Sequence, residues 1–206
     1  MDRRALVWVA ALLLSIRGTA HAGQLAIRAY DAYGVPVSQM ARAREVASAL
    51  LGAAGVDSVW IDCSTPADCQ SPVGRGEVVL RLVAAPSGES ANVLGEALVD
   101  HAAHTGVLAT VFADHVDRAA SRAQADGGVV LGRAIAHEIG HLLGSSHRTA
   151  GLMRSRWSDK ELRRQRDTDW MWSTLDAAEI RARLGRDPAT GSVTTCRGGD
   201  AKCVRG

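Results

Sequence analysis

The 206-residue sequence has little net charge, few cysteines and no long apolar run beyond its N-terminal end. After residue 22 the basic and acidic side chains are equal in number, so nothing in the charge indicates a nucleic-acid partner. No segment after residue 22 is long and apolar enough to be a membrane helix. We therefore expect no membrane contact once the first 22 residues are removed.

Signatures of several enzyme classes are also missing. There is no glycine-rich phosphate loop, no nucleotide-binding fingerprint, and no serine or cysteine nucleophile motif. His101, His104 and His115 could form a metal site with Asp100 or Asp114 as a carboxylate partner. However, His101 and His104 fall in an expected hairpin loop, where a histidine is usually solvated, so we expect no ion there.

The first 22 residues resemble a secretory signal peptide. Arg3 and Arg4 precede an apolar stretch over residues 5–16, and Ala20-His21-Ala22 forms a small-x-small cleavage site. The apolar stretch is too short to span a bilayer. The sequence therefore predicts a secreted or periplasmic protein with one domain, 23–190, and a short C-terminal tail, 191–206.

The four cysteines form two close pairs in a chain that we expect to reach an oxidising compartment. Of the three possible pairings we favour Cys63 with Cys69 and Cys196 with Cys203, the second of which would clip the tail. Neither spacing matches a structural zinc site. Free thiols remain the alternative if the protein stays in a reducing space.

The most informative segment runs from His137 to His147 and reads HExxHxxGxxH. Two histidines four residues apart on a helix lie about 40° apart around its axis, so His137 and His141 can reach one ion. If the helix continued, His147 would lie about 15 Å beyond His137, too far for ligand bonds of ~2.1 Å. The helix must therefore end between them, and Gly144 can adopt the left-handed conformation that ends it.

Three protein ligands leave one coordination position open, which is typical of a catalytic zinc site. Glu138 follows the first ligand and can act as general base on a zinc-bound water, while the ion lowers the pKa of that water and polarises the scissile carbonyl. The pattern therefore predicts one Zn²⁺ ion held by His137, His141 and His147, with Glu138 as the catalytic residue.

With Met153 six residues after His147, this pattern resembles that of the metzincin clan of zinc metallopeptidases, and within it the matrixin-like group. The resemblance implies that Gly151-Leu152-Met153 forms a tight turn whose methionine packs beneath the zinc ligands. Ser155 stands where astacin-like and serralysin-like enzymes carry an extra tyrosine ligand. Arg148 and the short spacing from His147 to Met153 depart from the matrixin pattern.

Hydrophobic periodicity predicts the remaining elements. Strands are expected at 24–30, 56–61, 77–84, 93–99 and 106–116, and a helix capped by Ser38 is expected to run to Leu51. The zinc helix should begin near Val129. Capping-box spacings at 158–161 and 173–176 predict two later helices, the second of which should end at Gly185.

This element order agrees with the resemblance, which implies an α+β fold. Its parts are a twisted, mostly parallel five-stranded sheet with an antiparallel edge strand, an active-site helix, the Met-turn and a C-terminal helix. In matrixin-like enzymes the edge strand binds an extended substrate. The resemblance places that strand at Leu94, Gly95, Glu96 and Ala97, although an ordinary edge strand explains these residues equally well.

Three tryptophans follow the expected Met-turn. Trp157, Trp170 and Trp172 could form the wall of the pocket that receives the residue after the scissile bond, but large aromatic residues are more often core, and we favour core.

Together these features predict a monomeric, secreted zinc endopeptidase acting on a peptide or protein substrate. Two alternatives stay open: a zinc hydrolase of non-protein amides such as those of cell-wall material, and a secreted zinc-binding protein without turnover. The intact Glu138 argues against the second, because a binding protein has no need of a general base.

Overall fold

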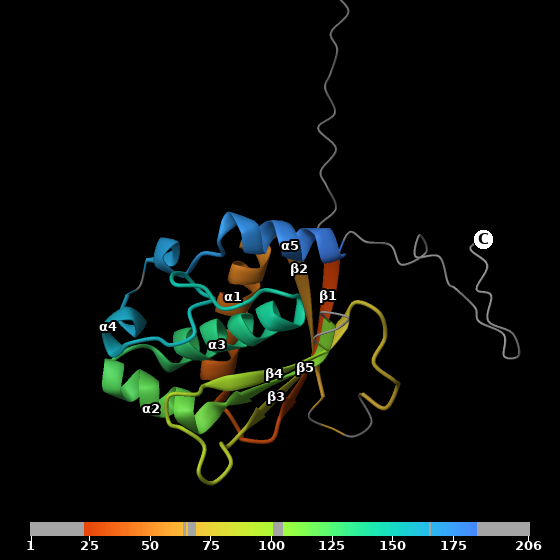
Figure 1. The fold of residues 1–206 in the computed structure, drawn as a ribbon. Helices are drawn as coiled ribbons and strands as arrows, with labels where there is room; N and C mark the ends of the chain where they lie inside the picture. The colour runs from red at the N-terminus through yellow and green to blue at the C-terminus, as the bar shows by residue number, and fades with distance from the viewer. Residues whose placement is uncertain (1–22, 64, 66–68, 101–104, 165, 185–206) are drawn as a thin grey trace, which may run out of the picture.

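A five-stranded sheet organises the chain (Figure 1). The computed structural model describes residues 23–63, 65, 69–100, 105–164 and 166–184. Its strands are β1 (Gly23–Asp31), β2 (Val56–Asp62), β3 (Glu77–Val83), β4 (Gly95–Asp100) and β5 (Thr105–Phe112), in the order β2-β1-β3-β5-β4. All neighbours pair in parallel except β4, which pairs antiparallel with β5 at the edge. The predicted fold class is confirmed.

Two long helices cover one face of the sheet. They are α1 (Val37–Ala53) and α3 (Gly127–Leu142), which pack against each other in the core of the domain (Figure 1). Alternate strand residues bury their side chains on this face: Leu80 and Leu82 of β3 are fully buried, whereas Arg81 between them is exposed. This alternation with a period of two is the pattern that the sequence displays.

Two expectations about this part of the chain were wrong. Helix α1 has Pro36 as its N-cap residue, with no side-chain cap hydrogen bond, and Ser38 lies inside the first turn. Proline there has its backbone fixed and needs no hydrogen-bond donor. The predicted strand 106–116 ends at Phe112, and a helix that we did not expect, α2 (Ala113–Ala123), follows at once.

The segment after α3 contains three short elements: α4 (Asp159–Leu162), the 3-10 helix η1 (Asp167–Trp170) and α5 (Thr174–Leu184). The capping box at Ser158 and Glu161 is present in full. At the start of α5 the Ser173 hydroxyl accepts a hydrogen bond from the Asp176 amide at 3.1 Å. Both caps are thus where their sequence spacing placed them.

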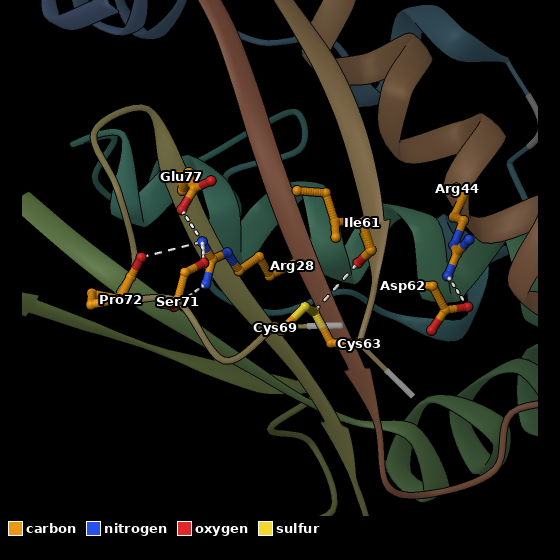
Figure 2. Close-up of a disulfide and its surroundings, with 9 residues drawn as sticks. All are labelled: Arg28, Arg44, Ile61, Asp62, Cys63, Cys69, Ser71, Pro72 and Glu77. Carbon is orange, nitrogen blue, oxygen red and sulfur yellow. Dashed lines mark hydrogen bonds and ion pairs between the residues drawn. A yellow bond between two sulfur atoms is a disulfide. The ribbon is translucent and has the colours of Figure 1, made fainter. Parts of the chain in front are cut away.

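The connection between β2 and β3 is fastened to the sheet at two places (Figure 2). Cys63 and Cys69 form the predicted disulfide, with their Cα atoms 5.6 Å apart. The buried Arg28 of β1 donates hydrogen bonds to the carbonyl of Ser71 at 2.6 Å and to the carboxylate of Glu77 at 2.6 Å. The disulfide and the hydrogen bonds of Arg28 thereby attach this long connection to the sheet.

Several expectations fall outside the described residues. These are the signal peptide over 1–22, the C-terminal tail over 191–206 with Cys196 and Cys203, His101 and His104, and Gly185. Among the helices in the described ranges, none combines the length and apolar character needed to cross a bilayer.

Candidate functional site

Helix α3 carries the first two predicted ligands. His137 and His141 are one helical turn apart, and their Nε2 atoms lie 3.1 Å from each other. The helix is buried on nearly all sides, because it is packed between α1 and the β4–β5 edge of the sheet. Its rigidity fixes the separation of the two imidazole rings.

The helix ends where the third ligand requires it to end. Gly144 has a φ of 91°. Its amide donates to the carbonyl of His141, and the Ser145 amide donates to the carbonyl of Gly140, both at 2.9 Å. This pair of bonds is a Schellman motif, which reverses the chain after a left-handed glycine. His147 consequently returns to the site, with its Nε2 atom 3.2 Å from that of His141.

The three histidines form a cluster with the geometry of a zinc site. Their candidate ligand atoms all lie within 4.8 Å of one another. Nitrogens bound tetrahedrally to one zinc at ~2.1 Å would be about 3.4 Å apart. The observed separations of 3.1 and 3.2 Å are close to that value.

Hydrogen bonds to the main chain select the tautomer of two ligands. The Nδ1 atom of His137 lies 2.8 Å from the carbonyl oxygen of Leu152, and that of His141 lies 2.8 Å from the carbonyl oxygen of Ser145. A carbonyl only accepts, so Nδ1 must carry the hydrogen and Nε2 keeps its lone pair. Both rings therefore present a metal-binding nitrogen to the centre of the cluster.

Burial also keeps these rings neutral. Burial is the main reason that the pKa of His137 is lowered to about 4; the neighbouring imidazoles add to the lowering, and the Leu152 carbonyl opposes it. Burial lowers the pKa of His141 as well. Neutral imidazole is the form that binds zinc, so the residues present fit the ion that the sequence predicts.

Glu138 is buried beside the cluster. The pKa of its carboxyl is raised to about 8, chiefly by burial and also by the charge of Glu96. Strand β4 comes very close, since a Cβ atom on Gly95 would lie 2.9 Å from the Oε1 atom of Glu138. Glycine at position 95 therefore lets the edge strand pass directly over the carboxylate.

The expected Met-turn is also present in geometry. Gly151 has a φ of 73°, and Met153 is almost fully buried. The Arg148 amide donates to the carbonyl of Met153 at 2.7 Å, which joins the turn to the segment that carries the third histidine. The sulfur of Met153 packs against α3 at Gly140, between the first two ligands.

An ion pair that sequence reasoning missed, in which the carboxylate is buried, supports His147. The carboxylate of Asp176 in α5 is completely buried and accepts two hydrogen bonds from the Arg148 guanidinium, at 2.9 and 3.0 Å. The hydroxyl of Ser173 donates to the same carboxylate at 2.5 Å. Because Arg148 follows His147 directly, α5 helps to fix the third ligand.

A cleft of about 260 Å³ opens over the candidate site. Its walls come from Ser90 and residues 92–95 on one side, from His137, Glu138 and His147 at the base, and from residues 154–157 on the other side. The cleft thus joins the histidine cluster, the carboxylate and the start of the edge strand in one accessible space.

The three tryptophans divide between core and cleft. Trp170 and Trp172 are buried, as we favoured. Trp157 lines the cleft, and its ring meets that of His137 edge to face with centroids 5.5 Å apart. The expectation of core residues is therefore confirmed for Trp170 and Trp172, and Trp157 is a cleft residue.

Of the four predicted edge-strand residues, Leu94 and Gly95 line the cleft, whereas Glu96 and Ala97 do not. His115 anchors the entry to this strand, because its Nδ1 atom lies 2.7 Å from the carbonyl oxygen of Val93. His115 thus has a structural partner.

A larger cavity, of about 570 Å³, lies between α1, the start of α3 and the η1 region. None of the three histidines lines it, and neither does Glu138. Size alone would select this cavity, but the convergent ligands and the buried carboxylate identify the smaller cleft as the candidate site.

Comparisons with known proteins agree with this geometry. Archaemetzincin from Methanopyrus kandleri is similar over 84% of this chain and 100% of its own, with a TM-score of 0.51 and 18% identity. Metalloproteinase-II from Bacteroides fragilis is similar over 79% of this chain and 54% of its own, with a TM-score of 0.50 and 14% identity. The chain has a metalloproteinase fold. No protein-family model matches the sequence, and no curated protein matches it.

Proposed function

We propose that the chain is a secreted zinc endopeptidase of the matrixin-like metzincin type. One observation carries the proposal: three Nε2 atoms converge beside a buried carboxylate at the base of an open cleft. A structural zinc site would be closed by a fourth protein ligand, whereas three ligands leave a position open. Within the described residues, the cluster contains no fourth histidine, cysteine or carboxylate.

The chemistry follows from the residues around the cleft. A zinc ion bound by the three histidines would supply a Lewis acid that lowers the pKa of water and polarises the scissile carbonyl. Glu138 takes the proton of the attacking water and then delivers it to the nitrogen of the leaving amine. Its burial makes the carboxylate a strong base, and a cation in the site would keep it ionised between catalytic cycles.

The substrate would lie extended along β4. Among the described residues this strand pairs only with β5, so its other edge is available for an added strand. Pairing at Leu94, Gly95, Glu96 and Ala97 would recognise the backbone of a peptide with little demand on its sequence. An extended polypeptide suits this edge better than a non-protein amide, which lacks the repeating donors and acceptors of a strand.

The remaining parts of the proposal concern the protein as a whole. It acts as a monomer on peptides or proteins, with one catalytic ion and with no nucleic-acid or membrane partner. The signal peptide over 1–22 directs it to a secreted or periplasmic location, where Cys63 and Cys69 can stay oxidised.

The test is cleavage of a diverse peptide library and of cell-wall fragments by purified, zinc-loaded protein. Glu138→Gln removes the base while keeping the shape of the side chain, and Glu45→Gln, at an exposed carboxylate of α1, serves as the matched control. We expect zinc-dependent peptide cleavage that Glu138→Gln abolishes and Glu45→Gln retains.

Other outcomes would redirect the proposal. Cleavage of cell-wall fragments alone would favour the alternative hydrolase. Stoichiometric zinc without cleavage of either substrate class would contradict the peptidase proposal and favour a binding role.

A further inference from the structure

The cleft has an uneven distribution of charge. Among the described residues, Glu138 is the single carboxylate that lines it, and it is buried at the base beside the histidines. Two cations, Arg154 and Arg156, line the wall formed by residues 154–157. The opposite wall, Ser90 and residues 92–95, carries no charged side chain. The accessible part of the cleft is therefore positive even before a metal ion is counted.

The two arginines differ in how far their charge is compensated. Arg154 is ion-paired with Glu161, whose carboxylate also accepts a hydrogen bond from the Ser158 amide at 2.9 Å. Arg156 is exposed, and it makes no hydrogen bond or ion pair with any residue in the described ranges. Its guanidinium is thus available to a ligand that enters the cleft.

The backbone that carries Arg156 is held from both ends. On one side, Arg148 and Arg154 form a β-bridge, and the Arg154 amide donates to the carbonyl of Gly151 at 3.4 Å. On the other side, Ser158 is fixed as the cap of α4. A short segment with two anchors fixes the backbone position of Arg156, so this part of the chain does not have to be ordered on binding.

We propose that this cleft selects substrates with a carboxylate next to the scissile bond, and that Arg156, assisted by Arg154, binds it. The inference rests on the proposed peptidase function. A planar guanidinium can form two parallel hydrogen bonds with a carboxylate, and partial enclosure strengthens them. The carboxylate can be an Asp or Glu side chain or the C-terminus of the substrate, since both offer the same pair of oxygens.

Matched peptides separate these two sources. One cleaved sequence is made with Glu, Gln or Lys at each position flanking the scissile bond, and a version that ends one residue after this bond is made with a free and with an amidated C-terminus. We expect kcat/KM to be about tenfold higher for the carboxylate-bearing member of a pair. A Glu over Gln preference identifies a side-chain carboxylate, and a free-acid over amide preference identifies the C-terminus.

Three variants test the residue itself. Arg156→Gln should remove most of the preference, and Arg156→Glu should reverse it in favour of Lys, with zinc content unchanged in both. Arg75→Gln, at an exposed arginine that does not line the cleft, is the control and should keep the preference. An undiminished carboxylate preference in Arg156→Glu, or none in the wild type, would overturn the proposal.

Binding to an inactive form keeps this test separate from the peptidase proposal. Zinc-loaded Glu138→Gln is titrated calorimetrically with the same peptides, so no turnover is needed. Tighter binding of the carboxylate-bearing peptides, lost when Arg156→Glu is added, supports the inference even if no peptide is cleaved. Equal binding, or no binding, of Glu and Gln and of acid and amide peptides refutes it.

Discussion

Replacing Gly140 by alanine tests how tightly helix α3 is packed against the turn that contains Met153. A Cβ atom at position 140 would lie 2.7 Å from two ring carbons of Trp172 and 2.9 Å from the sulfur of Met153. Carbon atoms in contact are normally about 3.5 to 4.0 Å apart. The ring cannot move away easily, because its N–H donates to the carbonyl of Leu50 at 2.5 Å.

The net change in the free energy of unfolding is the difference between two effects of the substitution. Overpacking of a core that cannot yield costs about 3 kcal/mol, the upper end of the usual range. Alanine inside a helix recovers about 1 kcal/mol relative to glycine. We therefore expect Gly140→Ala to lower the free energy of unfolding by about 2 kcal/mol, which corresponds to a fall in Tm of about 4 to 8 °C for a domain of this size.

The same substitution should weaken zinc binding. A displaced Met153 shifts the adjacent Leu152, whose carbonyl orients His137, and loss of such a contact typically costs about tenfold or more in metal affinity. Urea denaturation of the metal-free protein measures the loss of stability, and competition with a chromophoric chelator measures the loss of zinc affinity.

Gly52→Ala is the matched control for this experiment. Gly52 lies in the last turn of α1 with open space around it, so alanine there should stabilise the protein by about 0.5 kcal/mol. If Gly140→Ala were as stable as Gly52→Ala and bound zinc equally well, the close packing described for position 140 would be wrong.

Further predictions concern the ion pair, the buried carboxyl and the disulfide. Asp176→Asn keeps the side-chain shape but removes the charge that fixes the residue after His147, so we expect about tenfold weaker zinc binding by chelator competition; an unchanged dissociation constant would refute a positioning role. The pKa of Glu138 is raised from 4.5 to about 8 in the metal-free fold, so its contribution to stability is complete below the lower value and is lost as pH rises through the higher one. The stability of the metal-free wild type relative to Glu138→Gln should therefore fall between about pH 5 and about pH 8 in denaturation curves, and parallel curves would contradict this. Replacing both Cys63 and Cys69 by serine should cost about 2 kcal/mol of stability, as loss of a short disulfide loop does, and leave zinc affinity unchanged; weaker zinc binding would show that the loop supports the site.

Local sequence patterns predicted much of this structure because the relevant geometry is local. The spacing of His137 and His141 is set by one helical turn, and the return of His147 requires one left-handed residue. Strands β1 to β3 are predicted by their pattern of apolar residues, and the cap at Ser158 is predicted by its spacing of three residues from Glu161. Each of these features depends on residues within about a dozen positions of one another.

The features that the sequence did not predict depend on contacts between distant segments or on an apolar run that crosses the boundary between two elements. Helix α2 was missed because the apolar run of β5 passes through Phe112 to Ala113 without a break, although the buried residues of α2 recur at helical spacing. The Arg148 and Asp176 pair spans 28 residues, and no local spacing predicts it. The position of Arg156 in the cleft likewise follows from the path of the chain after the Met-turn.

The hydrogen bonds that orient His137 and His141 end on main-chain carbonyls, those of Leu152 and Ser145. Every residue type supplies a carbonyl, so substitutions at these two positions leave the acceptors in place as long as the backbone keeps its course. The orientation of these candidate metal ligands is therefore insensitive to substitutions in the supporting loops. The geometry of the histidine cluster can therefore be kept while residues 145 and 152 change.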